Sequence, residues 1–418
     1  MQGISGQLGP GESLYDWLKA AGRYVDAACG GRGSCGKCRV TLLDQGGQAK
    51  EEVLACRYRQ EGPFTVSLPV CDAPEITRLS SAEPPFYAAV DLGTTNIVAT
   101  LLSPQDGMVL STGSVPNRQR LFGADVMSRM QAAEEGHEET LKALAREDVE
   151  TLLRHLAGGN MPEKVALTGN TVMQHLYRGL PVKGLLTPPF TPVTTALETE
   201  EACTFLPGIG AYTGADLLCG IAVLSMGDQE ELTALLDIGT NGEIAVGNRD
   251  GIVTSAAAAG PAFENAGVGR GSEVVSMVYD LLTSGRMDET GLLLSEEEGV
   301  LTQKDIRDIQ LAKAAIRAGL LTCVKMRGAS LSDIKKLYIA GAFGTALDPE
   351  KAAGIGLIPK ELVLRTEAVG NTALLGAQRF LSTPGFADTM RTTKVLTKEI
   401  SLAEDAGFST LFMKSMRF

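Results

Sequence analysis

Four cysteines near the N-terminus have a spacing that could hold an iron–sulfur cluster. Cys29, Cys35, Cys38 and Cys56 are arranged as C-x5-C-x2-C-x17-C, which is close to the plant-type pattern C-x4-C-x2-C with a distant fourth cysteine. The glycine-rich stretch between the first three lets the backbone wrap closely around a cluster and point amide groups at its sulfurs. A zinc site would need a second cysteine or histidine pair, and a disulfide framework suits small secreted domains. The spacing therefore predicts a [2Fe–2S] cluster.

A second kind of chemistry is indicated by two similar turns. Asp91-Leu-Gly-Thr-Thr-Asn96 and Asp237-Ile-Gly-Thr-Asn-Gly242 each lie between apolar segments. Asp and Gly suit any tight hairpin, so one copy is weak evidence, whereas two copies indicate an internal repeat of domain size. Opposed turns of this kind can bind the phosphates of a nucleotide through backbone N–H groups and Thr hydroxyls, while the carboxylates hold hydrated Mg²⁺.

Three further positions are candidates for the same cleft. Asp216 precedes an apolar helical stretch and either caps that helix or faces the metal. The segment 339–344 reads as a strand that ends in a glycine turn, suited to passing close to an adenosine. Ser255 and its small neighbours permit close approach of a ligand or partner and are a candidate contact for it.

The predicted site residues are as follows. Asp91 and Asp237 are the candidate catalytic carboxylates. The predicted ligands of ATP and Mg²⁺ are Asp91, Gly93, Thr94, Thr95, Asn96, Asp216, Asp237, Gly239, Thr240, Asn241, Gly242, Gly341 and Gly344.

Composition narrows the class of protein. The chain has 418 residues, of which 44% are hydrophobic and 21% charged, and this is enough for two or three domains. Its net charge of −12 argues against nucleic acid as a partner, since phosphate binding needs clustered Lys and Arg. No apolar run reaches the roughly 18 residues of a membrane helix, and no signal-peptide pattern follows Met1. We expect a cytoplasmic protein that binds neither membranes nor nucleic acid.

The elements that must position these residues fall into two parts. Residues 1–76 predict a β-grasp domain, in which Ser13 and Asp16 mark the start of a helix before the cysteine loop. Residues 77–85 form a polar, proline-containing linker. Residues 86–418 contain the repeated turns, with a first subdomain at about 86–230, a second at about 231–370 and a C-terminal return at 371–418. The predicted class is therefore α+β followed by α/β.

The motifs also resemble known families. The cysteine loop resembles that of [2Fe–2S] ferredoxins. The two Asp turns and the segment 339–344 resemble the phosphate and adenosine motifs of the actin, sugar-kinase and heat-shock-chaperone ATPase superfamily, which implies two RNase H-like subdomains. The combination is similar to the reductive activators of corrinoid proteins. That resemblance implies ATP-dependent one-electron reduction of an inactive Co(II) corrinoid protein of a methyltransferase system to Co(I). It also implies an electron donor for the cluster and a homodimer formed through the ATPase domain. On this interpretation Ser255 is a possible contact with the corrinoid.

Three alternatives stay open at this stage. The chain could be an activator of radical dehydratases, although such activators bridge a [4Fe–4S] cluster between ATPase domains and this ATPase region has Cys203, Cys219 and Cys323 without a short motif. It could be a small-molecule kinase with an accessory ferredoxin. It could also be a nucleotide-regulated protein that uses its cluster as a redox sensor. ATP turnover that depends on a corrinoid protein would distinguish the main hypothesis from all three.

Overall fold

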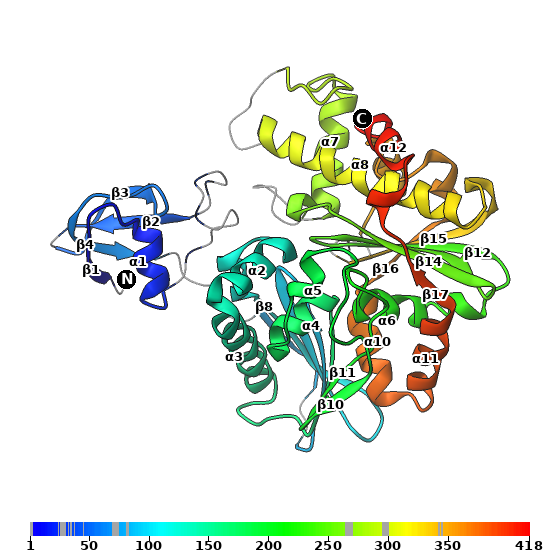
Figure 1. Ribbon diagram of the computed structural model, residues 1–418, viewed down its shortest axis with the longest axis horizontal. Helices are drawn as coiled ribbons and strands as arrows, with labels where there is room; N and C mark the ends of the chain where they lie inside the picture. Colours follow the sequence, from blue (N-terminus) through cyan, green and yellow to red (C-terminus); the bar gives the residue numbers. More distant parts are fainter. Residues whose placement is uncertain are drawn as a thin grey trace.

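A small N-terminal domain lies beside a larger body made of two lobes (Figure 1). The computed structural model describes residues 3–23, 25, 31, 33, 36, 38–44, 46–68, 75–80, 83–263, 271–294, 301–341, 343 and 346–418. Each lobe of the body contains one mixed sheet, and the small domain contains a third sheet.

The N-terminal domain is a four-stranded sheet covered by one helix. Its elements are β1 (Ile4–Leu8), α1 (Leu14–Ala20), β2 (Arg39–Leu43), β3 (Ala49–Leu54) and β4 (Gly62–Ser67), with strand order β1-β4-β2-β3. Helix α1 begins where predicted, because the Ser13 hydroxyl accepts a hydrogen bond of 3.1 Å from the Asp16 amide. Its apolar face is buried, and Trp17 packs edge-on against Phe64 of β4 at 4.8 Å between ring centres. This is the predicted β-grasp arrangement.

The first lobe is built on a seven-stranded sheet with the order β10-β11-β9-β6-β7-β8-β5. Its strands are β5 (Glu75–Arg78), β6 (Tyr87–Leu92), β7 (Asn96–Leu102), β8 (Val109–Pro116), β9 (Lys164–Thr168), β10 (Glu198–Glu200) and β11 (Cys203–Phe205). Its helices are α2 (Val126–Ala132), α3 (Glu138–Leu156), α4 (Thr171–Arg178), α5 (Lys183–Leu186) and α6 (Ala215–Val223). Between β8 and α3 lie a 3₁₀ turn, η1 (Arg118–Phe122), and a π turn, η2 (Ala133–His137).

The second lobe is built on a six-stranded sheet with the order β16-β15-β12-β13-β14-β17. Its strands are β12 (Leu232–Ile238), β13 (Gly242–Asn248), β14 (Gly251–Ala257), β15 (Ile334–Gly341), β16 (Thr366–Gly370) and β17 (Thr397–Glu399). The helices that follow in the chain are α7 (Ser272–Thr283), α8 (Gln303–Met326), α9 (Pro349–Gly354), α10 (Thr372–Ser382), α11 (Phe386–Leu396) and α12 (Phe408–Lys414).

The internal repeat is visible in the register of the two sheets. In the first lobe β6 pairs antiparallel with β7 and parallel with β9, and in the second lobe β12 pairs antiparallel with β13 and parallel with β15. Each Asp turn connects the antiparallel pair. Asp91 lies opposite Val98 on β7, whereas Asp237 lies opposite Glu243 on β13. The two turns therefore occupy equivalent places but have different neighbours.

Two boundaries differ from those predicted. Glu75–Arg78 belongs to neither the small domain nor a free linker, because it forms β5 and pairs antiparallel with β8 at the edge of the first lobe's sheet. The C-terminal return is also divided between the lobes. Leu374 and Phe386, from α10 and α11, pack in the first lobe's core with Ala89 of β6, whereas β17 joins the second lobe's sheet beside β14. The C-terminal chain thus ties the two lobes together.

No helix within the described ranges combines the length and the apolar character needed to cross a bilayer.

Candidate functional site

Two of the four predicted cluster ligands lie together in the described part of the N-terminal domain. Cys38 precedes β2 and Cys56 follows β3, and pairing of these strands brings their sulfur atoms to 3.2 Å from each other. Both side chains are buried and neither is in a disulfide. The Cys56 amide lies 3.5 Å from the Cys38 sulfur and donates to it, as amides do to cluster thiolates. Cys29 and Cys35 lie outside the described residues. The donor chemistry present, two thiols converging in a buried site, fits an iron–sulfur cluster.

The cysteine loop is supported from two sides. Gly31 has a positive φ of 83°, and a Cβ atom placed there would lie 2.6 Å from the Tyr15 ring, so this position requires glycine. Arg57 donates a hydrogen bond of 2.5 Å to the Gly33 carbonyl from the other side. Arg39, which follows Cys38 directly, forms an exposed ion pair with Glu52.

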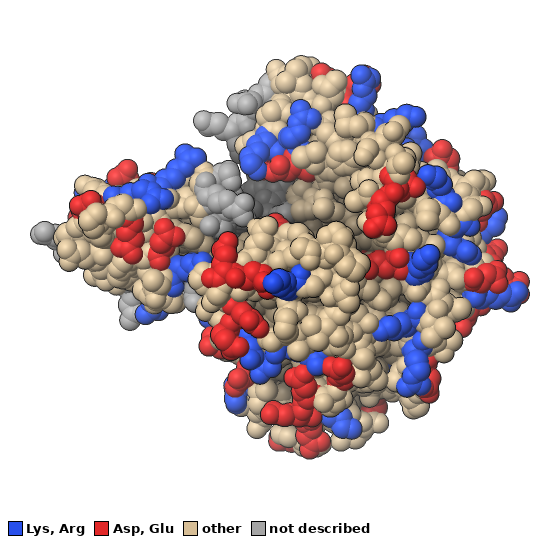
Figure 2. All heavy atoms as spheres, in the orientation of Figure 1, with Lys and Arg blue, Asp and Glu red and all other residues tan. Residues whose placement is uncertain are grey.

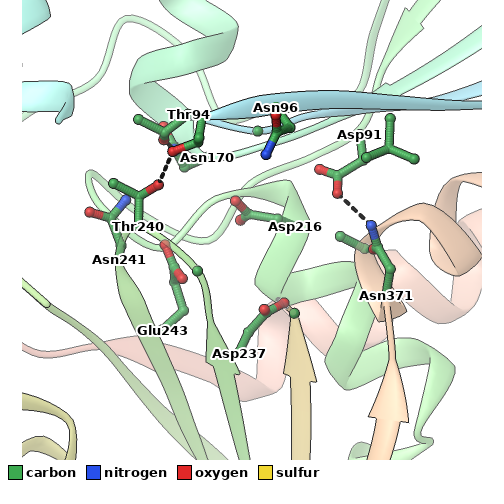
Figure 3. Close-up of a pocket in the computed structure, with 16 residues that line it drawn as sticks. Asp91, Thr94, Asn96, Asn170, Asp216, Asp237, Thr240, Asn241, Glu243 and Asn371 are labelled. Atoms are coloured by element: carbon green, nitrogen blue, oxygen red, sulfur yellow. Dashed lines mark hydrogen bonds between the residues drawn. The ribbon is translucent and has the colours of Figure 1, made fainter. Parts of the chain in front are cut away.

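The two Asp turns face each other across a cleft between the lobes (Figure 3). The cleft is lined by Asp91, Gly93, Thr94, Thr95, Asn96, Val98, Asn170, Asp216, Asp237, Gly239, Thr240, Asn241, Glu243, Gly341, Asn371 and Ala373. The Thr95 and Thr240 hydroxyls, which are 145 residues apart in the chain, lie 2.7 Å from each other. The structure thus brings both predicted phosphate turns to one site and joins them by a hydrogen bond across it.

The first turn is held by side chains from the same lobe. Asn170 caps α4 and donates a hydrogen bond of 3.2 Å to the Thr94 hydroxyl. Asn117 donates one of 2.9 Å to the Gly93 carbonyl. The guanidinium of Arg129 is fully buried and donates one of 2.6 Å to the Thr94 carbonyl. A cation is therefore fixed behind the turn, where it favours an anion in the cleft.

The second turn has acidic surroundings instead. Asp237 lies opposite Glu243, and Gly341 at the end of β15 passes next to it. Gly341 has a φ of 90°, and a Cβ atom at this position would lie 2.4 Å from Asp237 Oδ1, so no larger residue fits. Asp216 is in the first turn of α6, which Gly214 caps, and its carboxylate lines the cleft. The metal-facing alternative for Asp216 therefore agrees with its place in the structure.

Burial in this cleft raises the pKa of each carboxylic acid. Desolvation raises the pKa of Asp91 to about 6, against a hydrogen bond of 2.8 Å from Asn371 that lowers it. Desolvation, and then the charge of Asp91, raises the pKa of Asp216 to about 7. Desolvation and the charges of Asp216 and Asp91 raise that of Asp237 to about 8. The pKa of Glu243 is raised well above its usual value for the same reasons. Such a group of mutually repelling carboxylates is stabilised by a cation.

The geometry fits a hydrated rather than a bare metal ion. Within the described ranges no three carboxylate, His or Cys groups converge as direct ligands of one ion. Mg²⁺ commonly keeps several waters and is bound through one or two carboxylates together with substrate phosphates. A Cβ atom at Gly93 would lie 2.3 Å from the Asn96 carbonyl oxygen, so the tight turn between β6 and β7 requires glycine at this position.

Several functional residues were not predicted from the sequence. Asn170, Glu243 and Asn371 line the cleft, and Asn117 and Arg129 hold the first turn from behind. Glu243 follows the second Asp motif directly, so the alternation of β13 could have placed it beside Asp237. Asn371 is 280 residues from Asp91, to which it is hydrogen-bonded, and no local pattern signals that contact.

Two predicted residues are not in the cleft as expected. Gly242 starts β13 and faces α8, because a Cβ atom there would lie 2.7 Å from Ile316 Cγ1. Ser255 is 1% exposed and its hydroxyl donates to the Ile400 carbonyl at 2.9 Å, so it is a buried link between β14 and the C-terminal segment and is not available to a corrinoid. Gly344 lies outside the described residues.

Family models match three regions of the chain. A model of the 2Fe-2S iron-sulfur cluster binding domain matches residues 3–60. A model of the RACo middle region matches 86–229, and one of the C-terminal domain of RACo, the ASKHA domain, matches 231–280 and 280–418. The match at residues 3–60 confirms the predicted [2Fe–2S] domain, and the other two confirm the predicted ATPase region.

Two curated relatives and one solved structure are similar to the chain. Corrinoid activation enzyme RamQ of Eubacterium limosum is 29% identical over 80% of this chain and 71% of its own length. The [Co(II) methylated amine-specific corrinoid protein] reductase of Methanosarcina barkeri is 24% identical over 51% of each chain. The structure titled reductive activator for corrinoid, iron-sulfur protein matches 99% of this chain and 96% of its own with a TM-score of 0.74 at 21% identity, which confirms the predicted fold.

Proposed function

We propose that this chain, which belongs to the RACo family through its middle and C-terminal regions, is an ATP-dependent reductive activator of a corrinoid protein. The reaction returns the cobalt of that partner from inactive Co(II) to Co(I) by transfer of one electron. The observation that carries the proposal is the presence, in one chain, of a [2Fe–2S] binding domain and the RACo nucleotide-binding regions.

The cluster supplies a single low-potential electron when it is bound. Plant-type clusters have potentials of about −400 mV, and an acceptor that lies about 100 mV lower costs about 2.3 kcal/mol per electron. A nucleotide that binds two states of a complex with different affinities can supply a coupling free energy of this size. The two opposed turns are suited to sense nucleotide binding, since the Thr95–Thr240 hydrogen bond must open or rearrange when phosphates enter between them.

The cleft residues then have distinct roles. Asp91 and Asp237 are proposed to hold hydrated Mg²⁺, with Asp216 and Glu243 close enough to orient water on it. The backbone of the two turns and the hydroxyls of Thr94, Thr95 and Thr240 are proposed to bind phosphate oxygens. Nucleotide-driven change in the docked complex would make cobalt easier to reduce by removing an axial ligand.

The cysteines of the ATPase region argue against the radical-dehydratase alternative. Cys203, Cys219 and Cys323 lie in a strand and two separate helices. Burial raises the pKa of Cys203 and of Cys323 to about 12, and it also raises that of Cys219. These cysteines lie in separate elements, and no group of three potential ligands converges among the described residues, so they do not favour a bridging cluster in this region.

The finer identity of the partners is also part of this proposal. We propose that the corrinoid protein belongs to a methyltransferase system, that a separate electron donor reduces the cluster, and that two chains associate through the ATPase region. A cytoplasmic location suits cluster thiols that must stay reduced. Sedimentation velocity would test the dimer, since a monomer at micromolar concentration would contradict it.

The proposed function is tested by ATP turnover. The cluster-loaded, reduced protein should hydrolyse ATP faster when a Co(II) corrinoid protein is added, and Asp237→Asn should remove this stimulation. Asp388→Asn changes an exposed carboxylate on α11 and serves as the matched control, which should keep the stimulation. Hydrolysis that does not respond to any corrinoid protein would contradict the proposal, and a phosphorylated small molecule among the products would identify a kinase.

A further inference from the structure

The 3₁₀ turn η1 contacts the nucleotide cleft at one end and the iron–sulfur domain at the other. At the cleft end, Asn117 caps η1 and binds the first Asp turn twice. Its amide N–H donates to the Thr95 carbonyl at 2.9 Å, and its side-chain amide donates to the Gly93 carbonyl at 2.9 Å. Asn117 is fully buried. A displacement of the first turn therefore displaces the start of η1.

The far end of η1 is tied to the same turn by Arg129. Its guanidinium donates to the Thr94 carbonyl at 2.6 Å and to the carbonyl of Gly123, the residue that ends η1, at 3.0 Å. Gln119 of η1 also donates to the Leu141 carbonyl of α3 at 2.9 Å. Because η1 is held at its start, middle and end, it moves as a packed block and does not absorb the displacement.

The other side of η1 carries the contact with the small domain. The Tyr15 hydroxyl of α1 donates to the Leu121 carbonyl at 2.5 Å. The Lys19 ammonium, one turn later on α1, lies 4.2 Å from the centre of the Phe122 ring and 3.4 Å from His137 Nε2. These contacts join α1 to both η1 and η2.

Charge favours the same contact. His137, whose Nε2 lies 3.4 Å from the Lys19 ammonium, is flanked in the chain by four exposed glutamates, Glu134, Glu135, Glu138 and Glu139. In Figure 2 acidic side chains gather on the body beside that domain. Helix α1 and the residues after it contribute the cations Lys19 and Arg23. Exposed opposite charges steer the two surfaces together without fixing them rigidly.

Tyr15 also reaches the cysteine loop. Its ring lies against Gly31, where a Cβ atom would be 2.6 Å from ring carbon Cδ1. Gly31 lies between Cys29 and Cys35 in the sequence. One side chain thus touches the ATPase body with its hydroxyl and the cluster loop with its ring.

We propose that η1 and Tyr15 connect the nucleotide cleft to the iron–sulfur domain. Occupancy of the first phosphate turn would then change how this domain docks on the larger body. Asn117 and Arg129 are positioning residues in this connection, and Tyr15 and Lys19 form its contact with the small domain. The proposal deepens the proposed function and rests on it for its purpose, since a reductive activator must present its cluster to a partner. A neutral hydrogen bond and one cation–π pair are weak enough to be made and broken during each cycle.

Hydrogen–deuterium exchange of the full, cluster-loaded chain tests the connection without a corrinoid protein. Addition of Mg²⁺ with a non-hydrolysable ATP analogue should change the exchange rate of α1 amides (Leu14–Ala20) at least twofold, although α1 contributes nothing to the cleft. In a Tyr15→Phe, Lys19→Met variant this change should disappear, while the nucleotide-dependent protection of residues 91–96 and 237–242 persists. Lys50→Met alters an exposed lysine on β3 and should respond like the unmodified chain.

Asn117→Ala tests the cleft end of η1 separately. It should keep nucleotide-dependent protection at the second turn but lose the response at α1, and its melting temperature reports whether it folds. An α1 response that is absent from the unmodified chain, or that is unchanged in the Tyr15→Phe, Lys19→Met variant, would overturn the connection. Loss of the α1 response in Lys50→Met, to the same extent as in the double variant, would also overturn the connection. None of these outcomes depends on cobalt reduction, so the connection and the proposed function can fail independently.

Discussion

The two Asp turns have nearly the same sequence and opposite surroundings. Behind the first turn lie amides from Asn117 and Asn170 and the buried guanidinium of Arg129. Beside the second turn lie the carboxylate of Glu243 and the closely approaching Gly341. The repeated motif therefore specifies the same turn twice, while residues elsewhere in each lobe give the two turns different surroundings.

Because of this difference, the two turns are suited to different roles in the cleft. The first turn is connected through η1 to the small domain, and among the described residues no equivalent contact reaches that domain from the second turn. The second turn gathers carboxylic acids whose pKa values are raised by burial and by neighbouring charges, and a bound cation would favour their ionised form. The first side is thus suited to report nucleotide binding and the second to hold the cation.

The largest effect should come from removing either aspartate. Asp91→Asn and Asp237→Asn should each lower kcat for ATP hydrolysis about 100-fold or more, since each removes charge that stabilises a metal-bound phosphate. Steady-state phosphate release measures both. If one variant hydrolysed ATP within threefold of the unmodified chain, the two turns would not share the metal.

The affinity for Mg²⁺-nucleotide should depend on pH through the carboxylic acids of the cleft. Because the pKa values of Asp91, Asp216 and Asp237 are raised to about 6, 7 and 8, these groups bind protons that Mg²⁺ and nucleotide must displace. Apparent affinity for Mg²⁺-nucleotide should therefore fall about tenfold from pH 8 to pH 6. The ligand-free chain, which binds more protons folded than unfolded, should lose stability as the pH rises over the same range.

Calorimetry in buffers of different ionisation enthalpy measures this proton release directly. Asp237→Asn should reduce the number of protons released on binding at pH 7.5. Affinity that is constant between pH 6 and pH 8, with no proton release, would contradict the raised pKa values.

A smaller effect should follow from opening the hydrogen bond between the turns. Thr95→Val and Thr240→Val remove the same bond, so each should change the free energy of closing the empty cleft by about 0.5–1.5 kcal/mol. The double variant should cost less than the sum of the two single ones. Any difference between the two in nucleotide affinity then measures their unequal contacts with phosphate, and additive losses would show that the hydroxyls do not act as a pair.

The smallest effect concerns the contact of α1 with η1 and η2. Burial, and then the charge of Lys19, lowers the pKa of His137, against the raising effect of Glu135. Protonation is therefore disfavoured in the docked form, and docking should weaken as the pH falls below about 6.5. Exchange of α1, corrected for its intrinsic pH dependence, should rise about twofold from pH 7.5 to pH 5.5. His137→Gln should remove that rise, and a rise of the same size in the variant would show that another group titrates.

The parts of the site that could be predicted from the sequence are those with local signatures. The cysteine spacing, the repeated Asp turns and the Ser13 cap each occupy a few consecutive residues whose types are dictated by their chemistry. Asp216 could be proposed but not decided, because an acidic residue at a helix start has two common roles. In the structure Gly214 is the N-cap of α6 and Asp216 lines the cleft.

The remaining features depend on contacts between distant segments. Asn371 reads as an ordinary helix cap, which it is for α10, and the sequence does not reveal that the same side chain reaches Asp91. Small residues suit both ligand contact and tight packing, and Ser255 is buried with its hydroxyl hydrogen-bonded to the Ile400 carbonyl. Residues 75–76 read as the end of the first domain and 77–78 as the start of the linker, because a short polar strand carries no sign of the sheet it joins.

Anaerobic EPR of the reduced protein with a Co(II) corrinoid protein, recorded with and without Mg-ATP, tests the central claim most directly. The account predicts that the Co(II) signal disappears when ATP is present and persists when it is absent, and that Asp237→Asn retains the signal in both samples. Loss of the Co(II) signal at the same rate without nucleotide would contradict it, as would persistence of that signal with ATP while the cluster is fully reduced.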